Sequence, residues 1–191
     1  MKKIIGFVVF LYIGTISMAQ EMPQDTSWKK KYQETAEKIN DLVHTKLEVK
    51  PDFSKSYLYG KAWLTLKPHF YSTDSLRLDA KGMEIKTVSV VKAGKQSPLK
   101  FTYDEWNLRI KLDKTYKSTE AYTIYIEYTS KPDEFQEKYG TNDFLGIKGL
   151  YFIDPLGEDP EKPTQIWTQG ETESNSAWFP TIDKTNQKTT Q

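Results

Sequence analysis

The chain has 191 residues, and its 27 Lys and Arg are balanced by 26 Asp and Glu, with no cysteine. The charges of both signs are interspersed, so no basic surface for nucleic acid is expected. The absence of cysteine excludes disulfides and thiolate chemistry, and the core must come from packing, for which 12 Tyr, 9 Phe and 5 Trp supply aromatic surface.

Residues 1–19 have the pattern of a secretory signal peptide. "MKK" is positively charged, "IIGFVVFLYIGTI" is apolar but short for a membrane span, and "SMA" places small residues before Gln20. We expect the mature chain to begin at Gln20 and to be exported to the periplasm or the extracellular space. An uncleaved membrane anchor is the competing interpretation. No later segment is long and apolar enough to cross a bilayer, so no membrane partner is expected after cleavage.

Residues 20–40 form a predicted helical lead-in. A short helix is expected over residues 25–39, where apolar side chains fall at helical spacing: Trp28, Tyr32, Ala36 and Ile39. The segment carries many charges, which is typical of a surface helix or a flexible lead-in.

From Asn40 the hydrophobic period changes to two, and residues 41–191 are predicted to form one β-domain. Val43, Thr45 and Leu47 alternate with polar residues, and "YLYGKAWLTL" follows as a second strand in which Gly60 is a possible bulge. Further strands are expected in "DSLRLDA", "MEIKTVSVV", "PLKFTY", "NLRIKL", "AYTIYIEYT" and "GLYFID", with "DEW" as a hairpin tip. About seven short strands without intervening helices predict an all-β fold, an antiparallel β-sandwich or barrel.

No complete active site is evident in this pattern. The only two histidines, His44 and His69, lack a metal-ligand spacing and are expected on the surface. "GME" at residues 82–84 lies in a strand with Met83 and Ile85 inward, which is a structural role. The acids of the proline-rich loop "DPLGEDPEKP" do not follow a calcium-binding pattern and indicate a solvated turn; they are Asp154, Glu158, Asp159 and Glu161.

The segment "TQGETESNSAWFPTID", residues 168–183, resembles the end of the N-terminal domain of the zinc aminopeptidases of the aminopeptidase N family. That family has a Gln-x-Gln or Gln-x-Glu, a short polar stretch, an aromatic-Pro pair and an Asp. The matching positions here are Gln169, Glu171, Phe179, Pro180 and Asp183. Upstream, "YLYGKAWLTLKP", "LRLDAKGMEIKTVSV" and "AYTIYIEYTSKP" resemble strands of the same domain in the same order.

The resemblance implies a saddle-like N-terminal β-sandwich domain, followed in the family by a thermolysin-like catalytic domain and further domains. The family's Gly-x-Met-Glu-Asn strand and HExxH helix are absent from this sequence, which is therefore expected to end before the catalytic domain. Zinc would belong to the full-length parent, where it activates a water molecule as a Lewis acid. The chain itself is expected to bind no metal and to be inactive alone.

By the same resemblance, Glu171 binds the free α-ammonium group of a peptide substrate, and Gln169 shapes the neighbouring pocket. A carboxylate that accepts from an ammonium group makes a charge-assisted hydrogen bond. Phe179, Pro180 and Asp183 are expected to serve the architecture of the loop, with Asp183 accepting from backbone donors. An apolar patch for a partner domain is expected at Ile166, Trp167, Trp178 and Phe179.

Two other functions stay open at this point. A stand-alone β-sandwich could bind carbohydrate or another surface, with Trp106 at a hairpin tip stacking on a sugar. A catalytically dead relative acting as a scaffold is the third possibility, and this part of the sequence does not separate it from an active enzyme.

Overall fold

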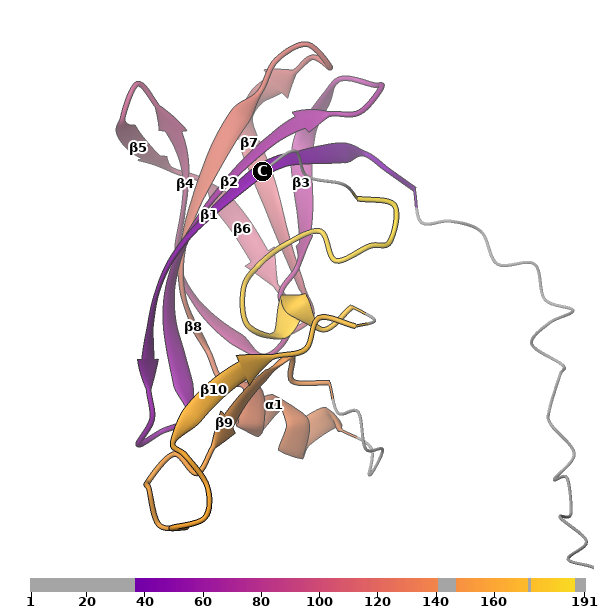
Figure 1. The fold of residues 1–191 in the computed structure, drawn as a ribbon. Coiled ribbons are helices and arrows are strands. Elements are labelled where there is room, and N and C mark those ends of the chain that lie inside the picture. The colour runs from indigo at the N-terminus through magenta and orange to yellow at the C-terminus, as the bar shows by residue number, and fades with distance from the viewer. Residues whose placement is uncertain (1–36, 141–146, 172, 188–191) are drawn as a thin grey trace, which may run out of the picture. The chain divides into compact units, whose positions relative to one another are not determined.

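The structure, a computed structural model, describes residues 37–140, 147–171 and 173–187. In these residues every strand pair is antiparallel, and the strands form three sheets. The all-β antiparallel fold predicted from the period-two pattern is confirmed (Figure 1).

The largest sheet has five strands in the order β1-β2-β8-β4-β5. These strands are β1 (Asn40–Asp52), β2 (Tyr57–Pro68), β8 (Tyr122–Ser130), β4 (Met83–Lys92) and β5 (Lys95–Pro98). A second sheet has the order β3-β7-β6, from β3 (Thr73–Asp79), β7 (Asn107–Tyr116) and β6 (Lys100–Tyr103). The edge strands β1 and β3 belong to different sheets, which matters for the end of the chain described below.

The two sheets share one hydrophobic core. The strands other than β5, which is exposed throughout, contribute side chains of one phase of their pleat, because successive residues point to opposite faces. The fully buried members include Leu64, Leu66, Leu76, Leu78, Leu108, Ile110, Ile124 and Ile126. Leu76, Leu78 and Ala80 lie on one face as predicted, and Met83 is buried while Glu84 is exposed, which confirms the structural role of "GME".

Gly60 is not a bulge, because β2 pairs with both β1 and β8 in continuous register around it. Its role is close approach: the ring of Tyr128 lies against the glycine, where any Cβ atom would overlap it. The irregularity occurs in β1 instead, between Leu42 and His44. This bulge lets Leu42 join the core ahead of Leu47.

A helix interrupts the strands, contrary to the prediction of none. Helix α1 (Pro132–Tyr139) follows β8, with Pro132 in its first turn and a single buried aromatic residue, Phe135. Pro fits the first turn because no intrahelical N–H is needed there. One buried aromatic in eight residues leaves too little helical periodicity to read from the sequence. A short 3₁₀ turn, η2 (Asn175–Ala177), lies near the C-terminus.

The predicted signal peptide and most of the predicted lead-in helix lie outside the described residues. Residues 37–39, the end of that helix as predicted, have no regular structure and lead into β1. Among the residues that the structure describes, no helix is both long and apolar enough to cross a membrane.

Candidate functional site: the loop of residues 169–187

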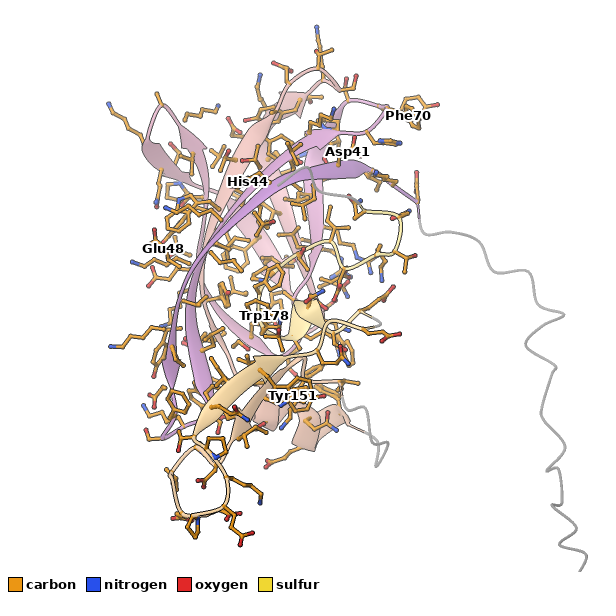
Figure 2. The ribbon with its side chains drawn as sticks, in the orientation of Figure 1. Asp41, His44, Glu48, Phe70, Tyr151 and Trp178 are labelled. Atoms are coloured by element: carbon orange, nitrogen blue, oxygen red, sulfur yellow. The ribbon has the colours of Figure 1, made fainter. Side chains whose placement is uncertain are left out.

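A small hairpin forms the base of the loop. It consists of β9 (Leu150–Ile153) and β10 (Gln165–Thr168), paired with Trp167 opposite Tyr151. The two rings stack with centroids 4.5 Å apart and planes 11° from parallel. A second apolar cluster fastens the hairpin to the start of β2, and its members are Leu58, Leu150, Phe152, Phe53 and Trp178. Figure 2 labels Trp178 of this cluster and Tyr151 of the hairpin.

The chain leaves the hairpin through two glycine contacts. Gln169 N donates to the Gly149 carbonyl at 2.9 Å, and Ser174 N donates to the Gly170 carbonyl at 3.1 Å. Gly149 has φ 61°, and a Cβ at this position would overlap the Ser174 carbonyl oxygen. A glycine is therefore required for the loop to close against the hairpin.

Gln169 and Glu171 lie together at the turn. Glu171 N donates to Gln169 Oε1 at a long 3.5 Å. The Glu171 side chain is exposed, and within the described ranges its carboxylate makes no hydrogen bond or ion pair. The Gln169 side chain is half-buried beside it. The acid is thus directed to solvent while the amide helps to shape the turn.

The residues that follow are tied to the β3–β4 turn. Lys81 N donates to the Ser176 carbonyl at 2.7 Å, and the Lys81 ammonium donates to the Glu173 carbonyl. Glu173 in turn pairs with Lys184 at 2.8 Å. The roles of Lys81 and Glu173 could not be predicted from the sequence, because a lysine in a turn and an acid in a polar loop carry no periodic signal.

Asp183 closes the loop as predicted. Its Oδ2 accepts from Ser176 N at 2.8 Å, and its own N–H donates to Asp79 Oδ2 at 3.0 Å. Thr181 pairs with Asp79 as an isolated antiparallel bridge. The segment after Pro180 is therefore fixed to the end of β3.

Lys184 is held in this network by opposing effects. Burial lowers the pKa of Lys184, but the hydrogen bond with Glu173 and the nearby Asp79 carboxylate raise it. The net pKa lies above the ordinary value, so the side chain stays charged at neutral pH.

Gln187 reaches the other sheet. Its amide accepts from Leu42 N at 3.2 Å and donates to the Asn40 carbonyl at 3.0 Å. Residues 181–187 thus join the edge strand β3 of one sheet to the edge strand β1 of the other (Figure 1).

The predicted apolar patch divides into two parts. Ile166 and Trp167 are exposed, by 37% and 47%. Trp178 and Phe179 are half-buried and pack on the two core clusters, and the Trp178 Nε1 is buried without a hydrogen-bond partner among the described residues.

The described residues contain no group of three His, Cys, Asp or Glu side chains that could hold a metal ion. His69 pairs with Asp41 at 3.0 Å. His44 is half-buried rather than on the surface as predicted, and its Nδ1 is buried. In the proline-rich loop, Asp154 accepts from Glu158 N at 2.9 Å, and Asp159 accepts from Glu161 N at 3.0 Å. These acids satisfy the backbone of a turn.

Trp106 does lie at the β6–β7 hairpin tip, but its ring is not free. It meets Phe135 edge-on at 4.9 Å and Tyr139 at 5.2 Å, both on helix α1, and is 38% exposed. This packing does not favour a sugar-stacking role.

The sequence matches a family profile described as the Peptidase M1 N-terminal domain, over residues 29–191. No curated protein sequence matches it. Among solved structures, a two-domain M1 zinc metallopeptidase mutant bound to L-arginine is similar, with a TM-score of 0.57 and 14% identity. That similarity covers 83% of this chain and 32% of the other.

Two further structures have the same fold. An M1 zinc metallopeptidase mutant from Deinococcus radiodurans, bound to a Tyr-Ser-Ala substrate, has a TM-score of 0.56 and 13% identity, covering 78% of this chain and 30% of that one. Yeast LTA4 hydrolase with bestatin has a TM-score of 0.58 and 18% identity, covering 88% and 26%. The chain thus spans about a third or less of the structures it resembles.

Proposed function

This chain belongs to the M1 peptidase family, and we propose that its loop of residues 169–187 holds the free α-amine of peptide substrates in a longer, exported zinc aminopeptidase. Glu171 accepts from the substrate's ammonium group, and Gln169 lies beside the first side chain. The family membership supports the class of enzyme, whereas the role of the loop is our proposal.

The observation that carries the proposal is the state of the Glu171 carboxylate. It is exposed, and among the described residues no side chain or backbone group is bonded to it. A carboxylate without an internal partner is available to accept a charge-assisted hydrogen bond from an ammonium group.

The rigidity of the loop supports the same role. Gly149, Lys81 and Asp183 each hold its backbone through a hydrogen bond of 2.7–2.9 Å. A held backbone on either side of Glu171 limits where its carboxylate can lie, and so positions the substrate's N-terminus relative to the reacting groups.

We propose that zinc is held by another part of a longer protein, because the similar structures are zinc metallopeptidases of which this chain covers about a third or less. The contribution of this chain is to bind and orient the amine.

Bound ligands in the similar structures agree with this chemistry. Two of the similar M1 zinc metallopeptidase structures hold L-arginine and a Tyr-Ser-Ala substrate, each of which carries a free amine. These ligands belong to those proteins, and they motivate substrates with a free amine, that is peptides with an unblocked N-terminus, for this one.

Kinetics of the longer enzyme test the assignment. The coding sequence around Gln191 is determined, and the longer polypeptide that it encodes is expressed. The kcat/KM for cleavage of an aminoacyl-nitroanilide is then measured for this protein and for its Glu171→Gln variant. Loss of one charge-assisted bond predicts a fall in kcat/KM of about 10- to 150-fold. The matched control is Glu158→Gln, an exposed acid of the proline-rich loop, which should leave kcat/KM unchanged.

An N-acetylated substrate separates amine binding from a general loss of activity. Its amine carries no charge, so the parent enzyme and Glu171→Gln should cleave it at the same low rate. Equal kcat/KM of the two proteins on the free-amine substrate would contradict the proposal. Export is tested by expressing the precursor in a Gram-negative host, where mass spectrometry should find a mature chain beginning at Gln20.

A further inference from the structure

The solvent face of the three-stranded sheet carries opposed like charges. Arg77 on β3 lies directly across from Arg109 on β7, and Lys111 on β7 lies directly across from Lys100 on β6. Cross-strand partners of equal charge are destabilising, because their Cβ atoms are only about 5 Å apart. Two such pairs in adjacent rows lower the stability of the folded domain, and the packing of the two sheets does not need charged residues at these positions.

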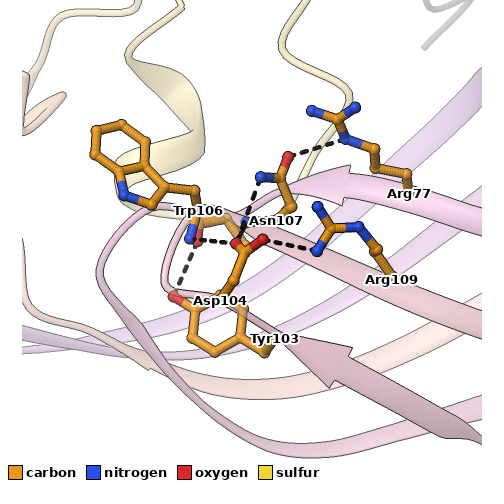
Figure 3. Close-up of polar contacts among 7 residues, drawn as sticks. Arg77, Tyr103, Asp104, Trp106, Asn107 and Arg109 are labelled. Atoms are coloured by element: carbon orange, nitrogen blue, oxygen red, sulfur yellow. Dashed lines mark hydrogen bonds and ion pairs between the residues drawn. The ribbon is translucent and has the colours of Figure 1, made fainter.

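Nearby carboxylates pair with only two of these four cations. Arg109 pairs with Asp104 at 2.7 Å, and Lys111 pairs with Asp74. Arg77 instead donates through Nε to the Asn107 amide oxygen at 2.9 Å, as Figure 3 shows. Within the described ranges, neither Arg77 nor Lys100 has a carboxylate partner. Two positive charges are left without compensation on one face.

A groove of about 580 Å³ lies over this face. Five cationic side chains line it against the two acids Glu37 and Asp79; the cations are Arg77, Lys100, Arg109, Lys111 and Lys184. Ile39, which is 50% exposed, adds an apolar side chain to the lining. Phe101 lies in the same row as Leu76 and Ile110, so its side chain is on the core face of the strands, and Ile182 packs on the core. The groove thus combines a positive floor with the exposed Ile39.

We propose that this groove binds an extended acidic peptide with carboxylates at alternate positions. Alternate residues of an extended chain point to the same side about 7 Å apart. The same spacing separates the Arg77–Arg109 row from the Lys111–Lys100 row, because each strand advances two residues between them. The intervening side chains of such a peptide face away from the cations.

The groove shares Ile182, Lys184 and Gln187 with the loop of residues 169–187, but neither Gln169 nor Glu171 lines it. It also binds the opposite charge. Glu171 would accept from an ammonium group, whereas the groove donates to carboxylates.

The test is fluorescence anisotropy with the full chain and labelled octapeptides blocked at both ends, which removes the free amine. One peptide alternates Glu and Ser, the second has the same composition in two blocks, and the third alternates Lys and Ser. We expect the alternating acidic peptide to bind at least several-fold more tightly than the block peptide, and the Lys peptide not to bind. Affinity should fall as salt shortens the Debye length.

Arg77→Gln and Lys100→Gln should each weaken binding about threefold, since each removes one exposed charge contact. Lys50→Gln and Lys61→Gln are matched controls with the same charge change on exposed residues of the five-stranded sheet, and they should bind as the parent does. Because Arg77→Gln relieves a like-charge pair, its thermal midpoint should be no lower than that of the parent, which excludes unfolding as the cause.

Three results would overturn the proposal. These are equal affinity for the alternating and block peptides, equal loss of binding in the Lys50 and Lys61 controls, and equally effective competition by a short single-stranded oligonucleotide, which would mean that the groove responds to charge alone.

Discussion

The sandwich core and the loop of residues 169–187 are stabilised in different ways. The core consists of many apolar side chains from both sheets that pack on one another, and many of them are less than 3% exposed. The loop depends on single hydrogen bonds, each made by one residue, such as that of Asp183 with Ser176 N. Loss of one core side chain should therefore weaken the whole domain, whereas loss of one loop contact should release only the loop.

Truncation in the core should give the largest effect on global stability. Leu64 is fully buried, and Leu64→Ala should lower the free energy of unfolding by about 2–5 kcal/mol through lost transfer energy and a cavity. Leu156→Ala is the control, because Leu156 is 63% exposed. Urea unfolding followed by circular dichroism measures both, and equal losses would show that Leu64 has no special place in the core.

Gly149→Ala should separate the two regions. The residue has φ 61°, and the new Cβ would overlap the Ser174 carbonyl, so a cost of about 1–3 kcal/mol is expected. Hydrogen exchange should accelerate in residues 165–178 while β2 and β8 stay protected. Gly94→Ala is the control, since Gly94 also has positive φ (76°) but no atom within 4 Å of the added Cβ. Uniform loss of protection across the core would contradict an independent loop.

Loss of the Tyr103 hydroxyl should give the smallest effect on stability. Tyr103 ends β6, and its hydroxyl binds the β3–β4 turn, which contacts both the core and the loop. Its hydroxyl accepts from Met83 N at 2.7 Å and donates to the Ala80 carbonyl at 2.9 Å. Burial raises the pKa of Tyr103 from 10.0 to about 12. Because the folded state holds this proton more tightly, its contribution to stability is complete below pH 10 and is lost as pH rises toward 12.

The measurement for Tyr103 is the free energy of unfolding against pH for the parent and for Tyr103→Phe. The parent should lose more stability than the variant between pH 10 and 12. At high pH the variant should show less phenolate absorbance than the parent, by the amount of one tyrosine. Parallel curves over this range would remove Tyr103 as the source of the pH dependence.

The regions also differ in what could be predicted from the sequence. Period-two alternation identified most strands and the inward positions of Leu76, Leu78 and Met83, because one face of each strand is buried. It did not identify β10, since all four of its residues are exposed and only the pairing with β9 makes it a strand. Helix α1 was missed because its sequence is mostly polar.

Gly60 illustrates a different limit. A glycine in a strand indicates either a bulge or a close neighbour, and only the position of Tyr128 decides between them. The candidate site residues Gln169 and Glu171 came from family resemblance, and their functional role stays a prediction. The partners that hold the loop, Lys81 and Glu173, are 92 residues apart in the sequence, so no local pattern links them.

The two hydrogen bonds of the Gln187 amide with β1 have a mechanical consequence. Because Thr181 is paired with β3 and Gln187 with β1, residues 181–187 are tied to both layers. A pull on this segment is therefore resisted by hydrogen bonds to two edge strands instead of one.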